Sequence, residues 1–253
     1  MLVAEPLLAG DPHYESQRRY FDAEFGDYTE YPLENWRRSY LERLAAAGLA
    51  GAEPLVDVGV GGSGYTVIEA ARAGAMAAGC DLSLQGLLSA RRFAASENVG
   101  QRTLWVCSSA ERLPFADASF AAAVAIAVFE HVPDDAAAFA EMARVLRPRG
   151  RAWVTVPHAL RRISPLFRRA NVRHDRRMGH LRRYEAEQLV EAGRAVGLRT
   201  IDVQFTGHAV KVAQLVLAPL GDRIWWLCER RDLRRANVRR GAMQLSAVFE
   251  KDA

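Results

Sequence analysis

Ten residues in the first quarter of the chain, Val56 to Tyr65, combine one acid with four glycines. They read VDVGVGGSGY, and Asp57 lies within a short apolar run, Pro54 to Val60, that is typical of a buried strand. Glycine has no Cβ, so it lets the backbone turn sharply into a helix and approach a ligand closely. The stretch is therefore interpreted as a nucleotide-binding turn.

The glycines alone leave the nucleotide open between NAD, FAD and S-adenosylmethionine. Gly59, Gly61 and Gly64 match the dinucleotide pattern G-x-G-x-x-G, and Asp81 follows about 20 residues later, where a ribose-binding acid is expected. Asp57, however, precedes the first glycine. A carboxylate there would repel a pyrophosphate and attract a sulfonium or an ammonium group. The charge favours a cationic ligand.

The elements that must position these residues alternate along the chain. Two helices are expected within residues 11–47, before the first strand. Strands are then predicted at 54–60, 76–80, 103–107, 121–127, 151–156, 198–205 and 242–250, and helices at 65–73, 83–97, 134–146, 185–196, 209–220 and 223–235. This alternation predicts an α/β fold with a doubly wound, mostly parallel sheet that binds ligands at the carboxyl ends of its strands. The candidate residues fall at or near those ends: Asp57, Asp81, Ser109, His131 and His158.

Length and composition indicate one domain with additions. The 253 residues are 50% hydrophobic, enough for a substantial core. We expect a helical cap at 1–50 and a main domain at 51–253, with a basic insertion at 157–183 and a helical insertion at 207–240. The start of the chain lacks a signal-peptide pattern, no apolar run approaches a membrane span, and the three cysteines are far apart, so a cytoplasmic protein is expected.

Three later segments carry a family resemblance. They read SSAERLPFADASF (Ser108 to Phe120), AIAVFEHVPDD (Ala125 to Asp135) and RVLRPRG (Arg144 to Gly150). In this order and spacing they resemble class I S-adenosylmethionine-dependent methyltransferases, within the ubiquinone-biosynthesis-like group that acts on small molecules. The resemblance covers roughly residues 54–200. It implies a seven-stranded Rossmann-like sheet with an antiparallel last strand, and S-adenosylmethionine as cofactor, with S-adenosylhomocysteine as product.

The resemblance also implies cofactor-binding residues. Asp57 would contact the methionine amino end, and Asp81 would accept hydrogen bonds from both ribose hydroxyls. The other implied contacts are Gly59, Gly61, Gly62, Ser63, Gly64, Leu82, Ser109, Ala110, Glu111 and Val128. Three positions depart from the family pattern. Ser63 replaces its third glycine, while Ser109 and Ala121 stand where an acid is common.

Methyl transfer from a sulfonium needs mainly alignment, desolvation and, for an O or N nucleophile, removal of a proton. His131 is the first candidate base, against the alternative that it only orders its loop, and His158 is the second. For His180 and Tyr184 a structural role is expected. Glu130 and His131 are adjacent in the sequence, which is poor spacing for shared ligation, so no metal site is predicted.

The acceptor is expected to be a small, acidic molecule. Nine arginines and one acid lie from Arg161 to Arg183, so this stretch carries a charge of +8. The formal net charge of the whole chain is +4, so the remaining residues sum to −4. Arg168, Arg169, Arg176 and Arg177 are the predicted anion-binding residues, against the alternative of a solvated basic surface. An RNA methyltransferase and a non-catalytic cofactor-binding regulator stay open. No DNA partner is expected, and any membrane contact is expected to be peripheral. The expected oligomeric state is a monomer or a homodimer. The aromatic residues of 11–47 are expected to pack on the sheet or to cover the ligand.

Overall fold

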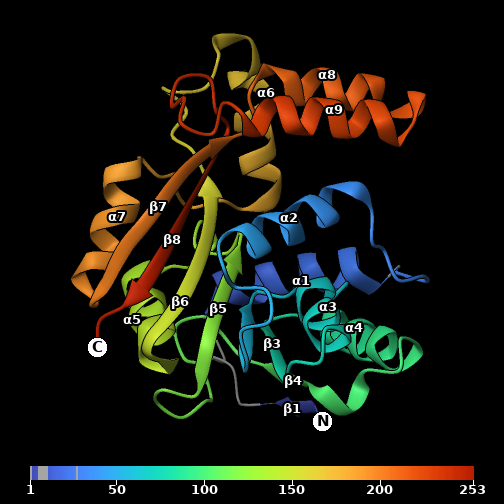
Figure 1. Ribbon diagram of the computed structural model, residues 1–253, viewed down its shortest axis with the longest axis vertical. Helices are drawn as coiled ribbons and strands as arrows, with labels where there is room; N and C mark the ends of the chain where they lie inside the picture. Colours follow the sequence, from blue (N-terminus) through green and yellow to red (C-terminus); the bar gives the residue numbers. More distant parts are fainter. Residues whose placement is uncertain (1, 5–10, 27) are drawn as a thin grey trace.

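One mixed sheet forms the centre of the protein (Figure 1). The computed structural model describes residues 2–4, 11–26 and 28–253. Within them the sheet has eight strands in the order β1-β4-β3-β2-β5-β6-β8-β7. The strands are β1 (Leu2–Ala4), β2 (Leu55–Val58), β3 (Ala77–Asp81), β4 (Thr103–Cys107), β5 (Phe120–Ile126), β6 (Leu146–Pro157), β7 (Leu198–Thr206) and β8 (Gln244–Lys251).

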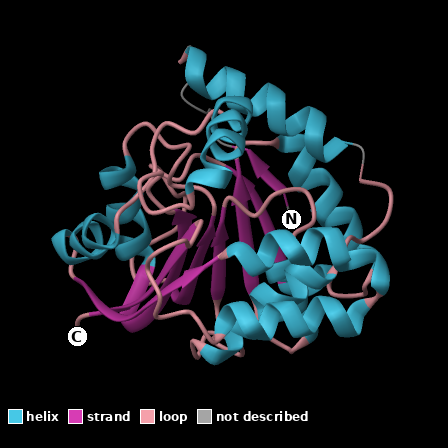
Figure 2. Cartoon of the chain, turned by 90° about the horizontal axis from the view of Figure 1, so that it is seen from above, coloured by secondary structure: helices cyan, strands magenta, loops and turns pink. Residues whose placement is uncertain are grey.

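Helices lie on both sides of this sheet (Figure 2). The described α-helices are α1 (Pro12–Gly26), α2 (Asn35–Ala46), α3 (Tyr65–Arg72), α4 (Leu84–Ser96), α5 (Asp135–Val145), α6 (Pro165–Met178), α7 (Ala186–Ala195), α8 (Ala209–Leu217) and α9 (Asp222–Leu233). Short 3₁₀ turns, η1 (Gly100–Arg102) and η2 (Ala218–Leu220), precede β4 and α9 respectively.

The sheet confirms the predicted doubly wound fold. β2 pairs in parallel with both β3 and β5, and β8 runs antiparallel to both β6 and β7. The carboxyl ends of β2, β3, β4 and β5 therefore lie along one edge. All seven predicted strands are present, with ends that differ by a few residues; β6 begins five residues early because Leu146 pairs with Phe120 before a bulge.

An eighth strand extends the sheet beyond the prediction. β1 pairs in parallel with β4 through Leu2 to Ala4. The expected helical cap at 1–50 is therefore wrong for these residues, although α1 and α2 confirm the two predicted helices. Residues 5–10, also within that expected cap, lie outside the described part. A three-residue strand has too little pattern to be recognised from sequence, since only its pairing partner defines it.

Two apolar layers cover the two faces of the sheet. On β2, Val56 and Val58 belong to the layer under α5 and α7, whereas Leu55 belongs to the layer under α2, α3 and α4. This alternation follows from the period of two in a strand. Burial of both faces explains why the parallel strands are nearly all apolar, and why polar side chains are concentrated at the strand ends.

Caps and insertions complete the fold. Ser83 and Asp134 cap α4 and α5 as predicted, because each side chain accepts a hydrogen bond from a backbone N–H three residues on, at 2.9 Å. The basic stretch 157–183 contains α6, and α8 and α9 form a hairpin in 207–240. None of the described helices is long and apolar enough to cross a membrane.

Candidate cofactor and acceptor site

The glycine turn connects β2 to α3 at the carboxyl edge of the sheet. Gly59, Gly61 and Gly64 have φ angles of +73°, +65° and +60°, which L side chains rarely adopt. Space is also restricted at Gly59, where a Cβ would lie 2.3 Å from Val128 Cγ2. Ser63, which replaces the expected third glycine, is buried within the turn, while Gly64 takes the left-handed position before α3. The turn therefore keeps its tight geometry with the last glycine one place later.

Asp57 is a buried acid whose hydrogen bonding is incomplete. Its side chain is 2% exposed, and Thr66 from the start of α3 donates its hydroxyl to Oδ2. The other oxygen, Oδ1, has no hydrogen-bond partner among the described residues. Burial raises the pKa of Asp57 to about 7, helped by the nearby Asp81 and opposed by the Thr66 hydrogen bond. A cationic ligand beside Oδ1 would satisfy this oxygen and favour the ionised carboxylate.

Asp81 lies at the end of the next strand and is tied to the glycine turn. Its Oδ2 accepts a hydrogen bond from the Gly61 N–H, and its Oδ1 accepts one from the Ser83 N–H, both at 2.8 Å. Burial raises its pKa to about 6, against the effect of these hydrogen bonds. A carboxylate has about four lone-pair sites, so Asp81 keeps capacity for two ribose hydroxyls. Its two oxygens are already oriented by the backbone.

The remaining predicted cofactor residues border the same edge. Val128 packs against Gly59 just after β5, and Leu82 follows Asp81. The loop after β4 carries a buried Ser109, a half-buried Ala110 and then Glu111, whose Oε1 accepts a hydrogen bond from the Asp134 N–H at 2.8 Å. The structure thus brings the residues from four strand ends onto one edge, as a cofactor that spans β2, β3 and β4 requires.

Helix α1 lies across this edge. From the sequence, the aromatic residues of 11–47 were expected either to pack on the sheet or to cover the ligand. Phe25 covers the glycine turn, since a Cβ at Gly62 would lie 2.6 Å from Phe25 Cβ. Asp22 accepts hydrogen bonds from Ser83 Oγ at 2.6 Å and from the Gln85 N–H at 3.2 Å, which anchors α1 to α4. The aromatic residues of 11–47 therefore divide between two roles: Phe25 of α1 covers the turn, whereas Tyr40 of α2 packs against Trp153 in the sheet.

His131 lies at the same edge in a cluster of polar groups. Its ring meets Phe21 edge-on at 5.5 Å and His180 at 4.7 Å between centroids. Burial and the neighbouring histidines lower the pKa of His131 to about 3, so the ring is neutral at physiological pH. Glu130 beside it is 1% exposed, and burial raises its pKa to about 8. The ligand atoms of Glu130, His131 and His180 all lie within 4.8 Å of one another.

The sequence argument against a metal had considered Glu130 and His131 alone. His180 was expected to be structural, and it follows α6, 49 residues further along the chain. Gly179 ends α6 in the left-handed conformation, and the Leu181 N–H donates to the Glu130 carbonyl at 2.7 Å. The turn at Gly179 and this hydrogen bond bring His180 next to His131. The segment GHLRRY was the available signal, but its partner could not be identified without the fold.

His158 and Tyr184 occupy positions with no access to the turn. His158 at the end of β6 is fully buried against Phe205, and its Nδ1 lies 3.2 Å from the Ala242 carbonyl oxygen. Its catalytic role stays a prediction without geometric support. Tyr184 donates its hydroxyl to Asp135 at 2.6 Å, and the same hydroxyl oxygen lies 3.2 Å from the Phe129 carbonyl oxygen, in agreement with a structural role.

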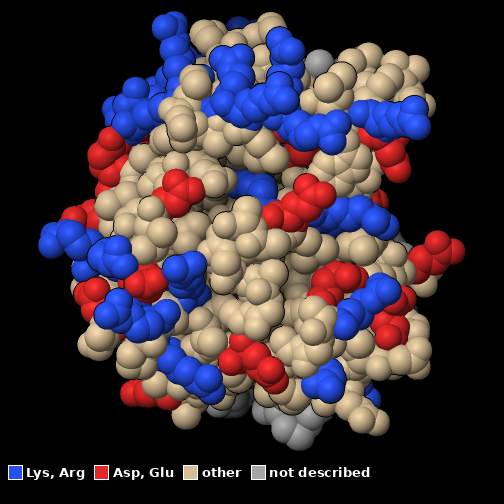
Figure 3. Space-filling view, in the orientation of Figure 1, with Lys and Arg blue, Asp and Glu red and all other residues tan. Residues whose placement is uncertain are grey.

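The arginine-rich stretch separates into two groups. Arg183 pairs with Asp175, Arg182 donates to carbonyl groups of the 129–133 loop, and Arg161 and Arg162 pair with Glu185. By contrast, the four predicted anion-binding residues of α6 are exposed: Arg168, Arg169, Arg176 and Arg177. Basic side chains gather over this part of the molecule (Figure 3). No hydrogen bond or ion pair among the described residues joins these four arginines to Glu130, His131 or His180; Arg168 donates to the Arg161 carbonyl instead.

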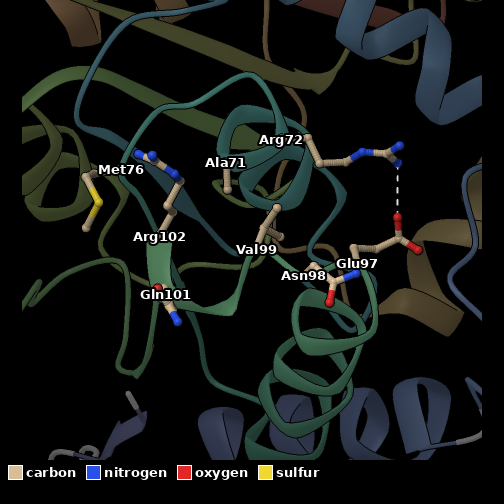
Figure 4. Close-up of a pocket in the computed structure, with 8 residues that line it drawn as sticks. All are labelled: Ala71, Arg72, Met76, Glu97, Asn98, Val99, Gln101 and Arg102. Atoms are coloured by element: carbon tan, nitrogen blue, oxygen red, sulfur yellow. Dashed lines mark hydrogen bonds and ion pairs between the residues drawn. The ribbon is translucent and has the colours of Figure 1, made fainter.

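A separate open hollow lies at the opposite edge of the sheet (Figure 4). It has a volume of about 490 Å³ and lies between the ends of α3 and α4 and the starts of β3 and β4. Arg72 and Glu97 form an ion pair of 3.1 Å on its rim. Because ligands of doubly wound sheets bind at the carboxyl ends of the strands, this hollow at the amino ends is not the candidate site.

The sheet order, the glycine turn and the acids Asp57 and Asp81 near the carboxyl ends of β2 and β3 are those of the class I methyltransferase fold. Residues 56–154 match the family model of a methyltransferase domain. This match covers less than half of the chain, and it lies within the residues that carry the motif resemblance.

Curated methyltransferases of two kinds are similar to parts of the chain. A demethylmenaquinone methyltransferase from Mycobacterium sp. (strain JLS) is 38% identical over 120 residues, which are 47% of this chain and 46% of the relative. The chain thus spans about half the length of the curated relatives it matches. Methyltransferase GfsG from Streptomyces halstedii is 32% identical over 157 residues, covering 52% of this chain and 56% of that protein.

Solved structures agree over almost the whole chain. The geranyl diphosphate C-methyltransferase from Streptomyces coelicolor A3(2) has a TM-score of 0.68 at 17% identity and covers 96% of this chain and 99% of its own. The [4+2]-cyclase SpnF has a TM-score of 0.65 at 20% identity and covers 99% of both chains. At such identities the likeness shows the fold, and since one neighbour is a cyclase, the fold by itself does not define the reaction.

Proposed function

We propose that this protein transfers a methyl group from S-adenosylmethionine to a small acceptor. The observation that carries the proposal is the buried Asp57, whose Oδ1 has no partner among the described residues and which stands beside a glycine turn. A carboxylate in this position suits the cationic methionine end of the cofactor and opposes a pyrophosphate. The methyltransferase family match and the residues after β3 and β4 support the same ligand.

Each residue of the edge has a defined part in this proposal. Asp57 would hold the cofactor's ammonium group, directly or through water, and the turn from Gly59 to Gly64 would lie against the methionyl chain. Asp81 would bind both ribose hydroxyls. Leu82 and the loop Ser109 to Glu111 would border the adenine, and Val128 would support the turn from below. S-adenosylhomocysteine is the product that remains bound after transfer.

The chemistry is an in-line displacement with an activated leaving group. Bound S-adenosylmethionine would supply an activated methyl group: as the acceptor atom bonded to the methyl carbon, the sulfur would keep the electron pair of the broken carbon–sulfur bond as a neutral thioether, and the proton lost by a phenolic or ring-carbon acceptor would pass to solvent. The protein must align the two reactants and exclude water. His131 is neutral, so it can accept a hydrogen bond from an acceptor hydroxyl; its pKa of about 3 makes it a poor store for a proton. Alignment is therefore expected to contribute more than base catalysis.

A hydroxylated aromatic ring is the acceptor that the relatives and the site favour. The matched relatives include demethylmenaquinone methyltransferases. Phe21 and Phe25, stacked at 5.4 Å between centroids, offer an apolar wall between the glycine turn and His131. Apolar walls with a few polar groups are typical of small-molecule sites. The acceptor atom would be a ring carbon or a phenolic oxygen.

An anionic acceptor is the second candidate, because four arginines of α6 are exposed on one surface (Figure 3). Neutralising Arg168, Arg169, Arg176 and Arg177 together to Gln should then raise the acceptor KM at least tenfold and leave the KM for S-adenosylmethionine unchanged. A matched control neutralises Arg91, Arg92, Arg199 and Arg234. If both quadruple variants keep the original acceptor KM, the arginines form a solvated surface.

Calorimetry with S-adenosylmethionine tests the cofactor, and a transfer assay with radiolabelled methyl tests the reaction. We expect one binding site per chain and label transfer to hydroquinone-type acceptors. Binding without turnover on any acceptor would favour a regulatory protein. Label transfer to RNA, with binding that weakens steeply as salt rises, would favour an RNA methyltransferase. Binding of NAD in place of S-adenosylmethionine would overturn the proposal.

A further inference from the structure

Three side chains with metal-ligating atoms converge at the carboxyl end of β5. Glu130 and His131 follow the strand, and His180 arrives from the end of α6; their ligand atoms all lie within 4.8 Å of one another. Glu130 is 1% exposed, and its Oε2 has no hydrogen-bond partner among the described residues. The same holds for His131 Nδ1. Buried polar atoms are normally satisfied, so these vacant atoms indicate a group that binds them.

The surroundings of His180 match the outer shell of a metal-binding histidine. His180 Nδ1 lies 2.9 Å from Asp175 Oδ1, and Arg183 holds Asp175 through two hydrogen bonds of 2.7 Å. A carboxylate near one ring nitrogen is typical of a metal-binding histidine, although the contact between His180 Nδ1 and Asp175 lacks the geometry of a hydrogen bond. A histidine that served only for packing would not need a carboxylate fixed by a guanidinium.

We propose that Glu130, His131 and His180 bind one divalent transition-metal ion, of the type represented by Zn²⁺. Two imidazoles and one carboxylate form the N₂O donor set common for such ions, whereas Mg²⁺ and Ca²⁺ prefer oxygen donors. Ligands at about 2.1 Å from a tetrahedral ion stand about 3.4 Å apart. Small side-chain rotations would therefore close the present arrangement around the ion. Three protein ligands leave at least one coordination position for a water molecule or another oxygen ligand.

The position connects the site to the cofactor edge. Phe25 covers the glycine turn, Phe21 stacks on Phe25, and His131 meets Phe21 edge-on. One layer of aromatic rings thus separates the three ligands from the turn. Helix α1 also contacts this segment, because His13 Nε2 lies 2.7 Å from the His131 carbonyl oxygen. The metal site rests on these contacts alone and does not require the proposed methyl transfer.

Cobalt titration provides the direct test. The full chain is freed of metal with a chelator, dialysed, and titrated with Co²⁺ while its visible d–d absorption is followed; Zn²⁺ is then added as a competitor. We expect one equivalent of Co²⁺ with the intensity of a four- or five-coordinate ion, and displacement by one equivalent of Zn²⁺. Saturation at less than 0.1 equivalent, or a spectrum of hydrated Co²⁺, would overturn the proposal.

Variants locate the ion. Glu130→Gln and His180→Ala should each weaken Co²⁺ binding by at least 100-fold, and Asp175→Asn should weaken it by about 10-fold to 100-fold through the outer shell. The control is His174→Ala, because His174 packs edge-on against His180 but is exposed and lies outside the ligand set. Equal Co²⁺ affinity for all four variants would place the ion elsewhere and reject the site.

The melting temperature, measured with and without Zn²⁺, distinguishes loss of the metal site from misfolding of a variant. Zn²⁺ should raise the melting temperature of the original protein and of His174→Ala, and leave that of His180→Ala unchanged. A zinc-induced rise that persists in His180→Ala contradicts the assignment. Calorimetry with S-adenosylmethionine on the metal-free protein separates the two proposals: cofactor binding without metal binding rejects only the metal site, and metal binding without cofactor binding rejects only the methyl transfer.

Discussion

Val128 occupies the space that a side chain at Gly59 would need. A Cβ at Gly59 would lie 2.3 Å from Val128 Cγ2, and the φ of Gly59 is +73°. The strand end of β5 therefore packs directly under the turn that follows β2. Two separate physical costs are expected for any substitution at Gly59: strain in the backbone and overlap with Val128.

Gly59→Ala should lower the free energy of unfolding by about 2–5 kcal/mol, because a left-handed alanine costs about 1–2 kcal/mol and overpacking a further 1–3 kcal/mol. Urea denaturation measures the loss. Gly51→Ala is the matched control: its φ is +78° and nothing described lies within 4 Å of its Cβ position, so only the backbone strain is expected. The double variant Gly59→Ala, Val128→Ala should recover the part of the stability that is lost through overlap with Val128. Equal losses at Gly59 and Gly51 would show that Val128 does not restrict the turn.

The affinity for S-adenosylmethionine should rise with pH. Asp57 has a pKa of about 7, because burial disfavours its charge, and the cofactor's ammonium group binds only the ionised form. Between pH 5.5 and 7.5 the Kd measured by calorimetry should fall by about 25-fold, with release of a proton. Asp57→Asn, which keeps the shape and cannot ionise, should bind more weakly and lose the pH dependence. The same slope in both proteins would assign the titration to another group.

Asp57 should also make the folded protein less stable as pH rises. Its pKa is raised on folding from an ordinary value near 4 to about 7, so the unfolded chain releases this proton first. The penalty is absent below about pH 4, grows between pH 4 and 7, and is complete above pH 7, where it amounts to roughly 4 kcal/mol. Urea denaturation at pH 5 and pH 8 should therefore show a steeper loss for the original protein than for Asp57→Asn. A parallel loss in the two proteins contradicts this role.

Phe25→Ala should speed both the binding and the release of S-adenosylhomocysteine by about tenfold, with a smaller change in Kd. The reason is that Phe25 covers the glycine turn and α1 must move for a ligand to enter or leave. Stopped-flow fluorescence measures both rates. Trp36→Ala is the control, because Trp36 lies in α2 and meets the rings of Tyr40 and Tyr65 edge-on, whereas Phe25 lies directly over Gly61 and Gly62. Unchanged rates in Phe25→Ala would mean that α1 does not cover the ligand.

Asp175→Asn should destabilise the fold by about 1–3 kcal/mol, because it breaks a bidentate ion pair that is largely shielded from water. Arg183 would keep a buried charge with fewer partners. Glu191→Gln is the control: its pair with Arg194 is exposed, so no measurable change is expected. Thermal denaturation of both variants gives the comparison. A Tm for Asp175→Asn equal to that of the original protein would show that the pair does not anchor α6.

Local patterns in the sequence were enough for most of the fold. The strands around Asp57 and Asp81 were predicted because parallel strands buried on both faces are short apolar runs, and the caps at Ser83 and Asp134 were predicted from side-chain chemistry that acts within one turn. The β1 strand was missed, since three residues become a strand only through pairing with β4. The cofactor edge followed from chain order, because consecutive parallel strands place their carboxyl ends together.

The sequence by itself therefore determined the sheet, the glycine turn and the acids beside it, because each depends on a pattern within a few residues. The tertiary structure alone decided which distant side chains meet. It placed α1 over the turn, buried His158 away from it, turned the arginines of α6 to solvent, and brought His180 to Glu130 and His131. Such meetings depend on how the insertion after β6 packs back on the sheet, and packing between remote segments leaves no periodic signal in the chain.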